Sequence, residues 1–270
     1  MTVYVCKESM EGILCGVYDA WMSKKGHENV RLQLDGCFEQ ELFAEYRDVQ
    51  LDNRKVSSVI TAIRRKIGEE AYEKVYISAL SQDTDRADKI YRFLIYGFKF
   101  GKRVMNMLQI PEVFEVFQMC RNVYNENHLL TGFVRFSEIE KTGFLFSKIA
   151  PKNAVLPLLA THFAERLSCE KWLIYDSGRR QAAVYYPSAG WALFQIEDRE
   201  AEEWEKWQNV QGEFEKLWKI FYKTIGIKER ENKVCQRTHL PLRFRGYMTE
   251  FEGEGGIDCL AEYTVQAPEG

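Results

Sequence analysis

Apolar residues repeat every three to four positions through much of the first 128 residues, a spacing typical of helices that bury one face. Short runs rich in β-branched and aromatic residues interrupt it and predict strands at residues 2–6, 30–34 and 49–51. We therefore expect residues 1–128 to form a mostly helical region with a few short strands. Helices are predicted near residues 13–22, 56–67, 72–80, 81–101 and 111–124, with Ser81 and Pro111 opening the last two.

After residue 128 apolar and polar positions alternate, as expected for half-buried strands. One predicted helix, residues 154–167, interrupts this part, with Asn153 as its expected cap and Pro157 near its start. Turn sequences at 176–178 and 187–190 favour tight connections between the later strands. The strands are predicted at residues 131–137, 143–149, 172–175, 181–186 and 191–196.

This order of elements predicts an α+β fold, because strands and helices are not strictly alternated. Residues 129–227 should form an antiparallel sheet of about five strands with helices on one face. A long aromatic helix over 204–221 ends this domain near Gly226, and an acidic stretch at 197–205 precedes most of it. Residues 228–270 then predict a basic arm followed by a flexible tail.

The arm combines basic side chains with Phe244 and Tyr247. Basic groups can follow a phosphate backbone while aromatic rings stack on bases, so nucleic-acid binding is one interpretation. Docking on the acidic stretch 197–205, or on a partner protein, is the other. The candidate nucleic-acid-binding residues are Arg179, Arg230, Lys233, Arg237, Arg243 and Arg245.

Composition narrows the class of protein. The 270 residues are 46% hydrophobic and 29% charged, which is ordinary for a globular protein, and the net charge is −3. That charge argues against a protein that binds nucleic acid over its whole surface, but it allows a local basic patch. No apolar run approaches the ~20 residues of a membrane span, and residues 1–10 lack the pattern of a signal peptide. We therefore expect a cytoplasmic protein without membrane contact.

The seven cysteines are scattered, and no two form a CxxC pair. This spacing predicts reduced thiols rather than disulfides, zinc ligands or an iron–sulfur cluster. The chain also has no Walker loop, no GxGxxG after a strand and no GxSxG elbow. Nucleotide hydrolysis and dinucleotide redox chemistry are therefore not expected, and no cofactor or metal is predicted.

The candidate catalytic residues are His162, Arg166, Asp176 and Arg135. At ~100° per residue, His162 and Arg166 share one helix face at the edge of the apolar arc, where polar heads need partners. We expect them to approach Asp176 or Arg135 in one cleft. The alternative is a structural ion pair, for instance with Asp176 or Glu126.

Each of the other candidates also has a structural alternative. Arg135, on the predicted strand 131–137, could bind phosphate or carboxylate, or pair with a neighbouring strand. Asp176 and Arg179 flank a predicted turn, where an aspartate commonly caps local amides. His128 could interact with the end of the preceding helix.

The same residues carry a resemblance to a known family. The motifs are His128 with 132–136, residues 151–153, His162-Phe163 with Arg166, and Trp172 with Tyr175-Asp176 and Arg179. They resemble the bacterial family of DNA metabolism proteins that is encoded beside a radical-SAM protein. A related domain is fused elsewhere to uracil-DNA glycosylase superfamily domains.

The resemblance implies DNA and a radical-SAM iron–sulfur protein as partners. It assigns no catalytic residues. Two function classes follow. The first is an accessory protein of DNA metabolism or repair that binds nucleic acid, the radical-SAM partner, or both. The second is a stand-alone enzyme, glycosylase- or hydrolase-like, that acts on a damaged base or nucleotide.

Overall fold

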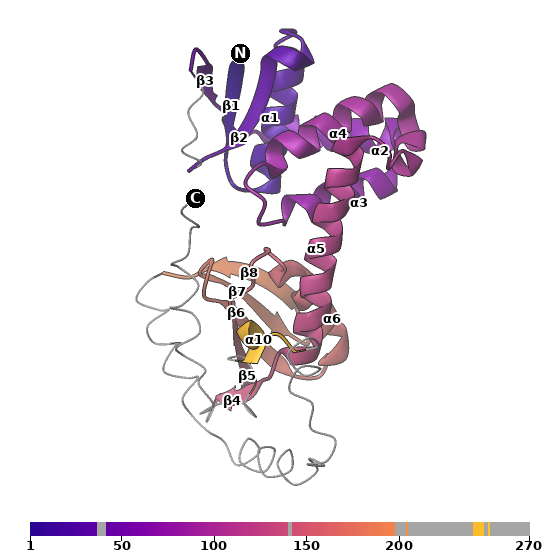
Figure 1. The fold of residues 1–270 in the computed structure, drawn as a ribbon. Coiled ribbons are helices and arrows are strands. Elements are labelled where there is room, and N and C mark those ends of the chain that lie inside the picture. Colours follow the sequence, from indigo (N-terminus) through magenta and orange to yellow (C-terminus); the bar gives the residue numbers. More distant parts are fainter. Residues whose placement is uncertain (37–41, 140–141, 198–203, 205–239, 246–247, 249–270) are drawn as a thin grey trace, which may run out of the picture. The chain divides into compact units, whose positions relative to one another are not determined.

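The structure is a computed structural model that describes residues 1–36, 42–139, 142–197, 204, 240–245 and 248. It divides into two compact units (Figure 1). The first contains residues 1–125 and 152–154, and the second contains 126–151 and the chain from 155 onward. The long helix predicted at 204–221, apart from Trp204, and most of the basic arm lie outside the described residues.

A three-stranded parallel sheet organises the first unit. Its strands are β1 (Thr2–Cys6), β2 (Val30–Leu34) and β3 (Glu45–Asp48), in the order β2-β1-β3. Helix α1 (Met10–Met22) connects β1 to β2 and lies against both, as a parallel pair requires a crossover (Figure 1). The predictions for β1 and β2 are confirmed, whereas the strand predicted at 49–51 is wrong. All four residues of β3 are exposed, so no apolar alternation marks this strand in the sequence.

Glycine allows α1 to pack tightly after β1. A Cβ on Gly12 would lie within 3.0 Å of the backbone oxygen of Lys7. One on Gly16 would lie within 3.0 Å of the Cys6 sulfur. Ser9 caps the helix, since its hydroxyl accepts a hydrogen bond from the Gly12 amide at 3.1 Å.

The remaining helices of the first unit match the predicted apolar periodicity. Ser81 does not cap the fourth helix: its hydroxyl accepts from the Asp83 amide, and Asp85 holds the cap position. Asn153 likewise does not cap the later helix, because its side chain accepts from the Gln82 amide. The helices are α2 (Asn53–Lys66), α3 (Glu69–Ala79), α4 (Arg86–Phe100) and α5 (Pro111–Phe133), with the 3-10 turns η1 (His27–Asn29) and η2 (Gly101–Asn106). Residues 111–125 of α5 belong to this unit, and the rest of the helix belongs to the second.

Helix α5 is longer than predicted and replaces most of the strand expected at 131–137. Leu130 and Val134 are buried, and the Val134 amide donates to the Leu130 carbonyl, so the helical hydrogen bonds run past residue 131. The alternation over these few residues was too short to distinguish a strand from a helix end. Only Ser137–Ile139 remain as a strand, β4.

The second unit contains the predicted five-stranded sheet, in the order β4-β5-β6-β7-β8. The α+β class is confirmed. One pair, β5 and β6, is parallel rather than antiparallel, because helix α6 (Leu156–Arg166) crosses over between them. The other pairs are antiparallel. The strands after β4 are β5 (Phe144–Ile149), β6 (Lys171–Asp176), β7 (Gln181–Tyr186) and β8 (Gly190–Gln195).

Alternation along β6 separates the two faces of this sheet. Leu173 and Tyr175 join an apolar cluster on one face, where Trp204 meets the Tyr175 ring at 5.5 Å. Trp172 lies on the other face, stacked on Tyr185. The Tyr185 hydroxyl donates to the carbonyl of residue 168, just beyond α6, so this is the face that α6 covers (Figure 1).

A last described helix, α10 (Leu242–Arg245), is a single short turn whose Phe244 is buried. Within the described ranges, no helix combines the length and the apolarity needed to cross a membrane.

Candidate functional site

Asp176 and Arg179 form a closely held charged pair in the second unit. Asp176 ends β6 and is fully buried, and its Oδ2 accepts from Arg179 Nη1 at 3.2 Å. Its Oδ1 accepts from the amides of Gly178 and Arg179. Arg179 Nη1 also donates to the Pro151 carbonyl at 3.0 Å. The pair therefore lies where the parallel strands β5 and β6 both end, which is the usual side for ligands of parallel strands.

The charge state of Asp176 follows from two opposed effects. Burial raises the pKa of this carboxyl above its ordinary value, while the Arg179 charge and hydrogen bonds from Arg179 and Gly178 lower it in part. A buried acid with a raised pKa is typical of functional sites. Here, however, both oxygens already accept hydrogen bonds within the turn, so Asp176 acts mainly to hold the Arg179 guanidinium.

Arg179 and Arg180 are consecutive residues of this turn. Arg180 is exposed and has a left-handed backbone, with φ of 51°. The backbone carbonyls of both arginines are held by hydrogen bonds. The Ile196 amide donates to the Arg180 carbonyl at 2.8 Å, and Gln195 Nε2 donates to the Arg179 carbonyl at 3.1 Å. The turn is thus tied to the end of β8, and the arginine backbone positions are set by the sheet.

His162 and Arg166 lie on α6, as predicted, but they do not meet Asp176. His162 is half-buried with its ring against Phe163, and Arg166 is exposed. In the described part of the chain, neither side chain makes a hydrogen bond or an ion pair. The hydrogen-bond partners of Asp176 come from its own turn, which a helical projection cannot reveal, and the approach of His162 and Arg166 to Arg135 in one cleft stays a prediction.

Arg135 lies between α5 and β4 instead of on a strand. Its Nη1 donates to the carbonyls of Gly132 at 2.8 Å and Val134 at 3.3 Å. These are carbonyls that the end of a helix leaves without intrahelical partners, so Arg135 caps α5. His128 is an exposed residue inside the same helix, and its carbonyl accepts from Thr131.

The described end of the basic arm docks on α5. The Phe244 ring is buried and meets Phe133 at 5.5 Å, and Arg243 approaches the buried Glu126 carboxylate at 3.5 Å. Phe244 is therefore packed as core and is not presented for stacking on a base. Arg245 is half-buried. The other predicted arm residues, Arg230, Lys233 and Arg237, lie outside the described residues, as does Tyr247.

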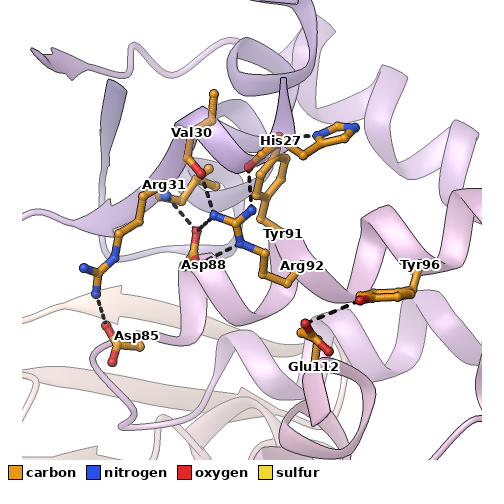
Figure 2. A network of polar contacts seen from close by, with 10 residues as sticks. His27, Val30, Arg31, Asp85, Asp88, Tyr91, Arg92, Tyr96 and Glu112 are labelled. Atoms are coloured by element: carbon orange, nitrogen blue, oxygen red, sulfur yellow. Dashed lines mark hydrogen bonds and ion pairs between the residues drawn. The ribbon is translucent and has the colours of Figure 1, made fainter. Parts of the chain in front are cut away.

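A polar network in the first unit fixes the connection between α1 and β2 (Figure 2). Arg92 on α4 donates to the backbone carbonyls of His27 and Val30 and pairs with Asp88 at 3.1 Å. Asp88 in turn accepts from the amide of residue 32. His27 Nδ1 and the Tyr91 hydroxyl share a hydrogen bond of 2.7 Å, and burial raises the pKa of Tyr91 to about 12.

Beside this network lies a pocket of about 260 Å³ between α1, α2 and α4. The Trp21 ring touches its neighbours edge to face, at 4.6 Å from His27 and 5.0 Å from Phe98. Lys66, the last residue of α2, places its ammonium 5.7 Å from the centre of the Phe98 ring. The lining residues are Val17, Tyr18, Trp21, Met22, Ser58, Val59, Ala62, Lys66 and Phe98.

Comparison with known protein families assigns this chain to one of them. A family model described as a domain of unknown function, DUF4130, matches residues 84–250, more than half of the 270 residues. The chain belongs to the DUF4130 family. No curated protein matches it. The DUF4130 match includes α4, α5 and the whole five-stranded sheet, and therefore all candidate residues of the second unit, whereas most of the pocket lies before it.

Sequence reasoning missed the pocket of this DUF4130 protein. The apolar spacing over residues 13–22 predicted a helix that buries one face, yet Met22 at its end is 58% exposed. An apolar stripe that extends to the last turn of α1, together with the basic end of α2, was the available signal. Which helices would meet around these residues depended on tertiary packing.

Proposed function

We propose that this DUF4130 protein is an accessory protein of DNA metabolism or repair that binds nucleic acid and works with a radical-SAM iron–sulfur protein. The partner and the DNA context come from the resemblance of the motifs around His162 and Asp176. A cytoplasmic location is part of the proposal, because both partners would be found there.

The observation that carries the nucleic-acid part is the arginine pair after β6. Asp176 holds the Arg179 guanidinium at the end of two parallel strands, and the exposed Arg180 follows directly. A guanidinium fits two phosphate oxygens at once and keeps its charge at any physiological pH, so two adjacent arginines on a fixed turn suit a phosphate backbone. Sequence-independent contacts of this kind supply most non-specific DNA affinity.

The arrangement supports binding more than independent catalysis. A general base needs a lone pair that faces the substrate within hydrogen-bond reach. The Asp176 oxygens accept from the turn amides and from Arg179 instead. Burial raises the pKa of Cys6 and of Cys120 to about 12, which keeps both as neutral thiols, so neither offers a thiolate nucleophile.

The direct test is DNA binding by the full chain, measured by fluorescence anisotropy over a range of salt concentrations. Arg180→Asn removes one charge and keeps a residue that tolerates a left-handed backbone. If Arg180 neutralises one phosphate, the slope of log K against log salt should become shallower by about 0.9 on duplex DNA or about 0.7 on single strands.

The matched control is Arg121→Ala, which removes one exposed charge from α5. It should leave the salt slope unchanged. Equal effects of the two variants would mean that net charge, not the β6–β7 turn, governs binding. Absence of DNA binding by the wild-type protein at low salt, with and without the partner, would overturn the nucleic-acid part.

The partner is tested separately by co-sedimentation with the radical-SAM protein, with and without DNA. We expect a complex that DNA stabilises, and little turnover by the isolated chain. Robust base release from uracil-containing or damaged DNA by the isolated protein would overturn the accessory function. Loss of that release in His162→Ala, with the fold intact, would then establish the enzymatic alternative.

A further inference from the structure

We propose that the pocket between α1, α2 and α4 binds a nucleotide unit, with the base among the aromatic walls and the phosphate at the end of α2. This inference goes beyond the proposed function, because it rests on the first unit alone and assigns a site to residues outside the arginine turn. The unit could be a free nucleotide or one residue of a single strand, and the experiment separates these sources.

The walls of the pocket suit a flat, apolar ring. Three aromatic side chains, Tyr18, Trp21 and Phe98, line it together with the exposed Met22. Stacking of bases on aromatic side chains tolerates any base, because every base has a π face. The thioether of Met22 is polarizable and adapts to rings of different outline.

The walls are also held in place before any ligand arrives. Trp21 contacts His27 at 4.6 Å and Tyr91 at 6.0 Å. His27 and Tyr91 belong to the network that Arg92 fixes in Figure 2. A wall whose ring contacts are set by part-buried hydrogen bonds loses little freedom on binding, and this pre-organisation favours affinity.

Positive charge at the end of α2 points to an anionic ligand. Lys66 lines the pocket, and its ammonium makes no ion pair with any described residue and lies 5.7 Å from the centre of the Phe98 ring. Arg65 is its exposed neighbour, and the stem of Lys102 lies against Gly68, two residues beyond Lys66. Lys66 is the cation that lines the pocket, and a phosphate there would both neutralise Lys66 and remain partly in water.

The volume sets the size of the ligand. Pockets for drug-sized molecules hold about 300–1,000 Å³. A volume of about 260 Å³ lies just below that range, so it suits one base and not a dinucleotide. The single polar hydroxyl in the lining, besides Tyr18, is that of the exposed Ser58, which agrees with stacking as the main contact.

Isothermal titration calorimetry of the full chain with thymidine monophosphate and deoxyadenosine monophosphate tests the site, with thymidine as the uncharged probe. Lys66→Gln should weaken nucleotide binding about tenfold or more, because a charged hydrogen bond is lost, and should leave thymidine binding unchanged. Lys99→Gln is the matched control: its ammonium also lies over a ring, Phe100, at 5.3 Å, but outside the pocket. It should not change the affinity.

Ala62→Phe, on the half-buried side of α2, should fill the pocket and abolish binding of both mononucleotides and thymidine. Circular dichroism checks that Ala62→Phe folds. If Ala62→Phe is unstable, the Lys66→Gln variant still tests the site. A short single-stranded oligonucleotide that binds in an Ala62→Phe-sensitive way, when mononucleotides do not, would assign the site to a strand.

Two results would overturn the inference: no Ala62→Phe-sensitive binding of any probe, or nucleotide binding that Lys66→Gln does not weaken. Neither result affects the Arg180 salt slope, so the failure of this site and the failure of the proposed function are distinguishable.

Discussion

The Asp176 carboxylate accepts a hydrogen bond from Arg179 Nη1 at 3.2 Å across the turn that follows β6. It also accepts hydrogen bonds from the backbone amides of Gly178 and Arg179 in the same turn. One side chain therefore closes the turn and orients an arginine. Asp176→Ala should lower the free energy of unfolding by about 3 kcal/mol, because it removes a buried partner of a charged group. Asp176→Asn should cost about 1 kcal/mol, since one oxygen can still accept both amides. Chemical denaturation measures both.

The pH dependence of this pair has a defined sign. Burial raises the Asp176 pKa above 3.8, so the folded state holds the proton more tightly than the unfolded state does. Its contribution to stability is present below about 3.8 and is lost as the pH rises through the folded pKa. As the pH rises through the folded-state pKa of Asp176, the Asp176→Asn variant should therefore gain stability relative to the wild type. The opposite trend in a denaturation series would show that Arg179 outweighs burial.

One chemical change should have opposite effects at two glycines. Gly12→Ala places a methyl group within 3.0 Å of the Lys7 carbonyl oxygen, and should destabilise the protein by about 2 kcal/mol or more. Gly132→Ala, in the last turn of α5, meets no atom within 4 Å and should stabilise it by about 0.5–1 kcal/mol. Thermal melts of the two variants compare these effects. Equal loss in both would contradict the packing of α1 on β1.

Docking of the arm on α5 can be tested at Phe244. Phe244→Ala removes a buried ring that meets Phe133, and should weaken this docking by about 3 kcal/mol, whereas Phe244→Leu should cost about 1 kcal/mol. Limited proteolysis with mass spectrometry should detect faster cleavage around residues 240–248 in the alanine variant. Unchanged protection would show that Phe244 does not hold the arm.

Cysteine labelling should follow burial. Burial raises the pKa of Cys6 and of Cys120 to about 12, so about one thiol in 10,000 is ionised at pH 8. Cys169 is exposed. In a time course with an alkylating reagent, the peptide that contains Cys169 should be labelled well before those with Cys6 and Cys120. Early labelling of Cys6 would place β1 closer to solvent than the structure has it.

The sequence by itself determined the elements whose side-chain pattern is long and regular. The apolar periodicity of α1–α4 and the β-branched runs of β1 and β2 each have a face that must be buried, so their positions follow from local pattern alone. The α+β class and the four strands β5–β8 followed from the same reasoning, whereas the strand expected at 131–137 is mostly the end of α5. The exposed strand β3 has no such face, and only its pairing with β1 defines it.

Tertiary structure decided which polar groups meet. A helical projection placed His162 and Arg166 at the edge of an apolar face, but the partners of Asp176 come from two residues of its own turn, Gly178 and Arg179. Arg135 became a helix cap because α5 continued past the expected boundary. The pocket beside Trp21 likewise required three helices to pack together, and its lining residues lie up to 81 positions apart, from Val17 to Phe98. Local sequence sets which side chains need partners, whereas the partners themselves depend on long-range packing that no local pattern encodes.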